Sequence, residues 1–188
     1  MGNVYYCYGC NNTTETTVIE KEQTLIVKGR SITLQVQVRV CAICGEEILD
    51  EELDAKTLDK FYNQYRYLEN LLFPEKIRAI RQKYHLSQAS FAKLLGFGEK
   101  TINRYENGAI QDVCHDNLIR LMDSMDSFML LWNERKDCVS EKERNFIDSM
   151  IKTYNSKMIC SVYNSAPVYY SRLSNENSFN KGEMSYAG

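Results

Sequence analysis

Two Cys-x-x-Cys pairs constrain the N-terminal fold of this chain more than any other feature of the sequence. They read "CYGC" at residues 7–10 and "CAIC" at residues 41–44. Four thiolates that meet favour a tetrahedral zinc ion, and four protein ligands leave no open position for water or substrate. The sequence therefore predicts a structural zinc ion with the ligands Cys7, Cys10, Cys41 and Cys44.

Two other interpretations of the cysteine pairs stay open at this point. A redox motif would need a thioredoxin-like βαβ context, which the surrounding pattern does not show, and an iron–sulfur site would also use thiolates. Gly9 inside the first pair and Gly45 after the second suit tight turns in which backbone amides approach sulfur. Ligand spacing is missing at the other cysteines and histidines, which we expect to be packed or simply exposed: Cys114, Cys138, Cys160, His85 and His115.

The segment between the cysteine pairs alternates between apolar and polar residues. "SITLQVQVRV" at residues 31–40 has a strict period of two, which is typical of a half-buried strand. "KGR" at residues 28–30 separates it from another β-rich run and predicts a hairpin, and residues 16–21 are a possible third strand. Residues 1–48 are thus predicted to form a small antiparallel zinc-binding β module. Its apolar face would carry Ile32, Leu34, Val36, Val38 and Val40.

The hydrophobic period lengthens after Cys44. Apolar residues recur at steps of three and four through a stretch without glycine or proline, which predicts an amphipathic helix over about residues 51–72. Phe73, which precedes Pro74, is driven away from helical geometry, and the proline suits the first turn of a new helix. Residues 49–73 are therefore predicted to be a linker helix.

The stretch "IRAIRQKYHLSQASFAKLLGFGEKTINRYENG" predicts three short helices separated by tight turns. Ser87 would cap the second helix, Gly96 would end it, and the third would begin near Glu99. The small residue Ala92 before the turn permits the close crossing that a helix-turn-helix needs. Residues 74–123 are predicted to form such an all-α domain.

Charge is distributed unevenly along a chain whose net charge is only -2. Residues 46–59 hold seven acids against one base, Lys56, whereas residues 76–104 hold seven bases against one acid, Glu99. A local basic excess is what a phosphate-facing surface needs. Gln88, at the start of the helix before the turn, is predicted to contact the phosphate backbone.

The third helix of the helix-turn-helix is predicted to enter the major groove of DNA. With Ile102 and Tyr105 facing inward, its outward residues are available to base edges and phosphates. The predicted DNA-binding residues on it are Lys100, Thr101, Asn103 and Arg104. Lys100 and Arg104 can each donate to guanine O6 and N7. The alternative is that Arg104 only pairs with Glu99 or Glu106 on a solvated helix.

The rest of the chain carries less information. Ser140 and Glu143 have capping-box spacing and predict a further helix up to about Tyr154, so residues 124–188 are predicted to be a helical extension with a frayed tail. No polar cluster combines a nucleophile, a base and an oxyanion site, and the protein is predicted not to be an enzyme. With no long apolar run and no signal peptide, we expect a soluble cytoplasmic protein and no membrane contact.

Taken in order, these parts resemble the MqsA family of type II antitoxins, with a YgiT-type zinc finger followed by an Xre/Cro-type helix-turn-helix. "CYGC", "VKGRSITLQVQVRVCAICGEE" and "FPEKIRAIRQKYHLSQASFAKLLGFGEKTINRYENG" carry the resemblance, which covers roughly residues 7–123. It implies an α+β fold, a structural zinc ion on the four cysteines, a toxin partner for the N-terminal module, and a homodimer that represses its operon through double-stranded DNA. The DNA-reading positions of the family fall on Lys100 and Arg104.

The sequence departs from the family pattern in two places. A proline usual after the recognition helix is replaced by "ENGAIQDVCHDN", and the chain continues for about 65 residues beyond Asp123. A stand-alone zinc-containing transcriptional regulator of phage or mobile-element origin, without a toxin, is therefore the alternative function.

Overall fold

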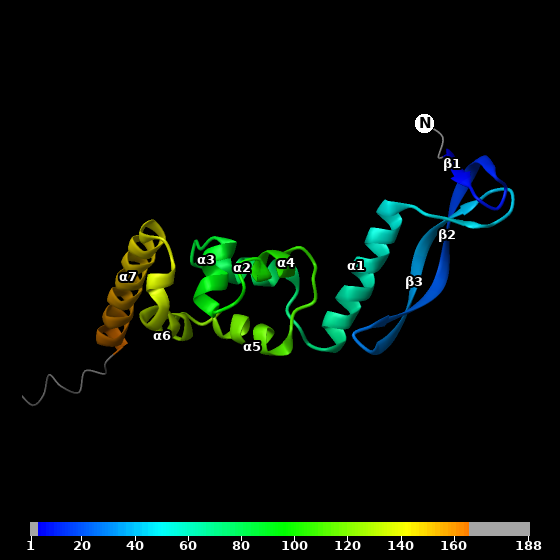
Figure 1. Cartoon of the computed structure of the whole chain (residues 1–188). Helices are drawn as coiled ribbons and strands as arrows, with labels where there is room; N and C mark the ends of the chain where they lie inside the picture. Colours follow the sequence, from blue (N-terminus) through cyan, green and yellow to red (C-terminus); the bar gives the residue numbers. More distant parts are fainter. Residues whose placement is uncertain (1–3, 166–188) are drawn as a thin grey trace, which may run out of the picture. The chain divides into compact units, whose positions relative to one another are not determined.

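The computed structural model describes residues 4–165, and the side chains as far as residue 157. The residues up to Arg144 form one compact unit, and those from Asn145 onward form a second. An antiparallel sheet is followed along the chain by helices, so the predicted α+β fold class is confirmed (Figure 1). The predicted frayed tail lies beyond residue 165, outside the described residues, and the predicted domain boundaries stay predictions.

Four antiparallel strands make the sheet, in the order β1-β2-β3-β4. They are β1 (Val4–Cys7), β2 (Asn12–Val27), β3 (Arg30–Cys41) and β4 (Glu47–Ile48). The predicted hairpin is present, since Val27 pairs with Arg30 around Lys28 and Gly29, whose φ angles of 46° and 84° fit a two-residue turn.

Two features of the sheet differ from the expectation. The segment predicted as a possible third strand is the middle of β2, a single strand of 16 residues. Strands β1 and β4 were not predicted, because segments of four and two residues beside the cysteine turns are too short to show alternation.

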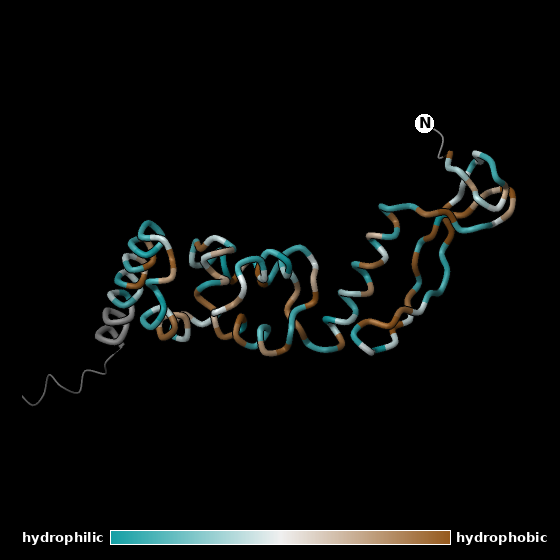
Figure 2. Tube along the Cα trace, in the orientation of Figure 1, coloured by the Kyte–Doolittle hydropathy of each residue, from teal (hydrophilic) through white to brown (hydrophobic). Residues whose placement is uncertain are grey.

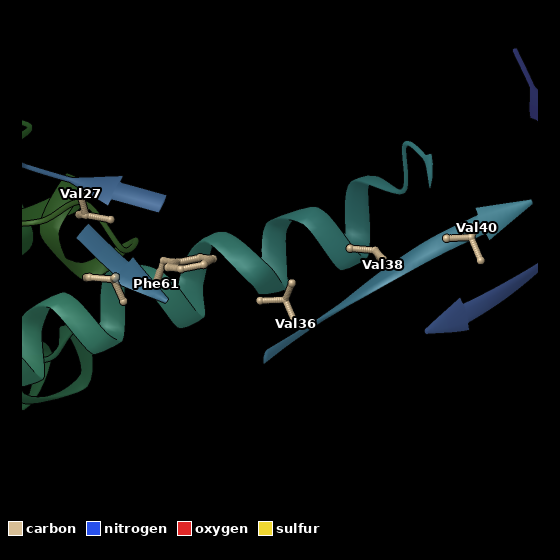
Figure 3. Packing of buried hydrophobic residues seen from close by; sticks show 6 residues of the cluster. Val27, Val36, Val38, Val40 and Phe61 are labelled. Atoms are coloured by element: carbon tan, nitrogen blue, oxygen red, sulfur yellow. The ribbon is translucent and has the colours of Figure 1, made fainter. Parts of the chain in front are cut away.

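Helix α1 (Glu51–Leu68) covers the apolar face of β3. The buried cluster consists of Val27, Ile32, Val36, Val38, Val40 and Phe61. Figure 3 shows these side chains along the face of the hairpin on which α1 lies, and Figure 2 shows the matching alternation of hydrophobic and hydrophilic residues along β3. The face predicted from the period of two is therefore the buried one.

Helix α1 ends four residues earlier than predicted. Asn70 adopts a left-handed φ of 51°, which stops the helix, and the apolar residues that extended the pattern, Leu71 and Leu72, are buried outside it. The Leu72 amide donates to Asp116 Oδ1 at 2.8 Å, so the chain enters the next domain through a fixed contact.

A buried ion pair joins the sheet to the start of α1. Asp50 caps the helix by accepting from the amides of Glu52 and Leu53, and it also accepts from Arg39 Nε at 2.6 Å. The Arg39 guanidinium lies 4.3 Å from the Tyr5 ring centroid, a cation–π contact. Arg39 belongs to the polar face of β3, yet it is only 8% exposed because these partners cover it.

Within the described part of the chain, six helices and one 3₁₀ turn follow α1. They are α2 (Pro74–Lys83), α3 (Gln88–Leu95), α4 (Thr101–Glu106), α5 (Val113–Leu121), α6 (Met125–Arg135), η1 (Lys136–Cys138) and α7 (Glu141–Ser165). Ser87 caps α3 and Gly96 ends it with a φ of 78°, as predicted, whereas α4 begins at Thr101 and not at Glu99. Among the described helices, none is both long enough and apolar enough to cross a lipid bilayer.

The helical part has its own apolar core. Its fully buried side chains include Ile77, Ile80, Leu86, Phe91, Leu94 and Ile102. Helix α6 contributes to the same region: the Phe128 ring stacks on Tyr84 with centroids 3.5 Å apart, and the Tyr84 hydroxyl donates to the Met122 carbonyl at 2.6 Å. A segment that the sequence pattern left as an extension therefore packs against the helix-turn-helix.

Candidate metal centre and nucleic-acid interface

The four predicted ligand cysteines meet at one end of the sheet. Their sulfur atoms all lie within 4.8 Å of one another, with Cys7 Sγ and Cys44 Sγ 3.5 Å apart and Cys10 Sγ and Cys41 Sγ 3.8 Å apart. Metal–sulfur bonds of about 2.3 Å imply sulfur–sulfur edges of about 3.8 Å in a tetrahedron. The donor set therefore fits one tetrahedral ion, and no other such cluster occurs among residues 4–157.

Strand pairing explains why residues distant in sequence converge here. Cys7 and Cys41 end β1 and β3, and the turn after each strand returns the second cysteine of its pair. Pairing of β2 with β3 sets Thr16 opposite Cys41, and the Ala42 amide donates to the Glu15 carbonyl at 3.0 Å. The paired strands and the turns after β1 and β3 are therefore sufficient to bring the four sulfur atoms together.

Hydrogen bonds to sulfur hold the two turns in the shape of a metal knuckle. The Cys10 amide lies 3.5 Å from Cys7 Sγ, and the Ile43 amide lies 3.4 Å from Cys41 Sγ. Gly45 has a φ of 76°, a left-handed conformation that favours glycine. The predicted role of Gly45 as a turn residue fits this geometry.

Thr14 is a residue that sequence reasoning missed. Its Oγ1 lies 3.2 Å from Cys41 Sγ, and its side chain is buried. No local motif marks it, because the contact depends on strand pairing that brings together two residues 27 positions apart in the sequence. Hydroxyl donation to a thiolate stabilises the charged form, which a metal ligand must adopt.

The ionisation of the four thiols is unequal. Hydrogen bonds, above all from Thr14, lower the pKa of Cys41 to about 6, whereas the neighbouring thiols, above all Cys44, raise the pKa of Cys10 to about 12. One negative sulfur therefore opposes the ionisation of the next. A cation at the centre of the cluster would offset this repulsion, which is the electrostatic setting of a metal site.

The predicted recognition helix is α4. Lys100, Asn103 and Arg104 are exposed on it or at its start, and Thr101 is half-buried, while Ile102 and Tyr105 face the core. The orientation of the helix predicted from the inward pair is therefore the observed one.

Glu106 is the last residue of α4, and its side chain binds residues of α2 and α3. Its carboxylate is completely buried and accepts from Arg81 Nε at 2.6 Å, from Arg78 Nε at 3.4 Å and from Gln88 Nε2 at 2.8 Å. Burial opposes ionisation, but these donors outweigh it, and the pKa of Glu106 is lowered. Arg104 is not among its partners, so the alternative pairing of Arg104 with Glu106 is not formed.

Gln88 is more constrained than the sequence indicated. Its Oε1 accepts from Asn103 Nδ2 at 2.8 Å while its Nε2 donates to Glu106, so the side chain bridges α3 and α4. The predicted interface residues Gln88 and Asn103 are thereby fixed relative to each other before any ligand binds. Sequence reasoning missed this network because Glu106 carried no signal that it would be buried.

A second contact fixes the other side of α4. The Tyr105 hydroxyl and His115 Nδ1 lie 2.7 Å apart, and the Phe97 ring stacks on the His115 ring with centroids 3.9 Å apart. Burial raises the pKa of Tyr105. His115 is therefore a packing residue, in agreement with one of the two expectations for it, whereas Cys114 and Cys138 are exposed.

The tip of the hairpin approaches the segment that follows α4. Lys28 Nζ donates to the Gln111 carbonyl at 3.3 Å, and the Arg66 guanidinium on α1 donates to the Gly108 carbonyl. An open groove of about 520 Å³ between these parts is lined by apolar hairpin residues and by Arg104. The end of the sheet distant from the cysteines therefore contacts the helix-turn-helix domain.

Comparison with known protein families gives a match that covers more than half of the chain. A family model described as the antitoxin component of a bacterial toxin-antitoxin system, MqsA, matches residues 5–136. No curated protein matches the chain. The matched region contains all four clustered cysteines and helix α4, and it extends beyond the quoted motifs to the end of α6, but it leaves out α7.

Proposed function

Because the chain belongs to the MqsA antitoxin family, we propose that it neutralises a protein toxin by direct contact and represses its own operon as a DNA-bound homodimer. The cytoplasm is the compartment in which both activities would take place. The observation that carries the proposal is the presence, in one chain, of a closed tetrathiolate site and an exposed helix α4 whose neighbours are held by a buried network.

Zinc is the ion proposed for the cysteine cluster. Four soft thiolates at tetrahedral spacing suit it, and the edge lengths of 3.5 and 3.8 Å agree with its bond length. The ion would hold β1, β3 and their turns together and supply no catalysis, since four protein sulfurs fill its coordination sphere. No enzymatic activity is proposed for this protein.

DNA recognition is proposed for the exposed side of α4. Lys100 and Arg104 would donate to guanine O6 and N7, and Thr101 and Asn103 would contact neighbouring bases or phosphates. Gln88 would contact a phosphate from the start of α3. Fixed positions for Gln88 and Asn103 support this proposal, because a pre-organised surface loses less conformational entropy on binding.

The toxin is proposed to contact the N-terminal module near the metal loops. Three large apolar side chains are exposed there, Tyr8 and Ile43 inside the two cysteine pairs and Leu49 just beyond β4. The acidic stretch 46–59 has fewer free carboxylates for a basic toxin surface, because Glu47 pairs with Lys21 and Asp50 is buried on Arg39. Apolar contact is therefore the better supported mode.

Substitution of Arg104 tests the DNA-binding part. Arg104→Ala should abolish specific binding to the DNA upstream of the gene while the circular dichroism spectrum stays unchanged, because the side chain is exposed. Arg104→Lys is the matched control, since it keeps the charge and loses the bidentate fork. Equal affinity of Arg104→Ala and the wild type for that DNA would contradict the proposal.

The alternative function, a stand-alone regulator without a toxin, shares the DNA-binding surface and differs only in the N-terminal module. Co-expression with the product of the flanking gene discriminates between the two. Co-purification that is lost in a Tyr8→Ser, Ile43→Ser variant supports the antitoxin, whereas the lack of any complex favours the regulator.

A further inference from the structure

Helix α3 is held at both ends by residues from the segment after the helix-turn-helix. At its C-terminal end, Arg135 Nη2 donates to the Lys93 carbonyl at 3.1 Å. At its N-terminal end, Glu143 accepts from the Ser87 amide at 3.1 Å and from Ser90 Oγ at 2.7 Å. A cation at the C-terminus and an anion at the N-terminus both suit the helix dipole.

The carboxylate of Glu143 is firmly anionic in this position. Its Oε2 also accepts from Ser140 Oγ at 2.7 Å. Partial burial opposes ionisation, but the three serines outweigh it and lower the pKa of Glu143 to about 2. A fixed negative charge therefore lies at the start of α3 at every physiological pH.

The same end of α3 has a place in the proposed DNA interface. Gln88, the first residue of the helix, follows Ser87 directly and is linked to Asn103 on α4. An amide that donates to Glu143 is not available to a phosphate oxygen, and a carboxylate beside a phosphate is repulsive. DNA that approached α4 in the proposed way would therefore meet Glu143.

We propose that Glu143 makes an autoinhibitory contact: its carboxylate occupies the N-terminal end of α3, where a phosphate of the DNA backbone would otherwise bind. Full DNA affinity then requires the first turn of α7 to leave this position. This inference rests on the proposed DNA-binding function. Glu143 lies beyond the region that the family model matches, so the contact is a feature of the added C-terminal segment.

A purely structural cap is the competing explanation, and Arg135 supplies the matched control. Glu143→Gln and Arg135→Gln each remove a charge from one end of α3, and each is expected to lower the melting temperature. Only Glu143→Gln removes a charge from the end that would face a phosphate. The two variants therefore separate the loss of helix stabilisation from the release of a DNA contact.

The experiment measures binding of wild type, Glu143→Gln and Arg135→Gln to the duplex upstream of the gene over a range of salt concentrations. One regained phosphate contact should tighten binding by Glu143→Gln about tenfold and steepen the slope of log K against log salt by about 0.9. Arg135→Gln should bind like the wild type or slightly more weakly.

Two results would overturn the inference. If all three proteins bind with equal affinity and slope, Glu143 is only a cap, and the proposed DNA binding survives. If Arg135→Gln binds as tightly as Glu143→Gln, the gain comes from loosening α3 and not from an uncovered phosphate site. Failure of all three proteins to bind any duplex would instead refute the DNA-binding function itself, and the inference with it.

Discussion

The cysteine end of the sheet and the helix-turn-helix domain are held together by different means. Around the four sulfurs the buried side chains are Cys7, Cys41 and Thr14, and the apolar cluster lies on the hairpin under α1. The helical domain has a continuous apolar core and a buried carboxylate network centred on Glu106. We therefore expect the first region to depend on an ion and the second to depend on its own packing.

Removal of the metal is expected to affect the cysteine end of the sheet and not the helical domain, and this is the largest effect that we predict. Chelation is expected to unfold the metal-proximal part of residues 1–48, because without a cation the four sulfurs repel one another and little apolar surface is buried around them. Amide signals of the full chain, followed by nuclear magnetic resonance, should collapse for β1, β4 and the metal-proximal ends of β2 and β3. Retention of those signals after complete removal of the metal would show that the metal does not hold this part of the module together.

Neutralisation of Glu106 should weaken only the helical domain. Glu106→Gln leaves the largely buried Arg81 and the half-exposed Arg78 facing an uncharged buried side chain, and we expect the free energy of unfolding to fall by about 3 kcal/mol. Urea unfolding measures the change. Glu52→Gln is the matched control, since it breaks an exposed pair worth about 0.5 kcal/mol or less. A cost for Glu106→Gln as small as that of Glu52→Gln would mean that the network does not stabilise the domain.

A fall in pH should lower the stability of the helical domain by a smaller amount. The pKa values of Glu106 and Glu143 in the folded chain lie below the ordinary value of 4.5, so the stability they contribute is complete above pH 4.5 and is lost as the pH falls toward 2. The urea midpoint of the helical domain should decrease through that window. In Glu106→Gln the decrease should be shallower, because one of the two groups no longer titrates; an identical pH profile would contradict this assignment.

Local sequence signals predicted a large part of this structure. The period of two in residues 31–40 fixed the buried face of β3, and the Ser87 cap and Gly96 stop fixed α3, because each depends on neighbours along the chain. The cysteine cluster was also predictable, since two Cys-x-x-Cys pairs on tight turns have few functions other than binding a metal ion.

Contacts between distant segments were not predictable in the same way. Arg39 looked like a solvent-facing strand residue and is buried on Asp50. Glu106 looked like an ordinary helix terminus, and its side chain is completely buried. Both depend on desolvation and on partners that only the tertiary fold supplies. Glu143 was predicted as a helix cap, but its contact with α3 needed the structure.

The central claim is a division of labour, in which the metal holds the N-terminal module and α4 contacts DNA independently of that ion. The most direct test is to measure the affinity of the full chain for the duplex upstream of its gene before and after complete chelation. The account predicts that the dissociation constant stays within about threefold, a change of less than 1 kcal/mol, because the helical core contains no metal ligand. A loss of DNA binding in parallel with the unfolding of the metal-proximal part of the sheet would contradict it.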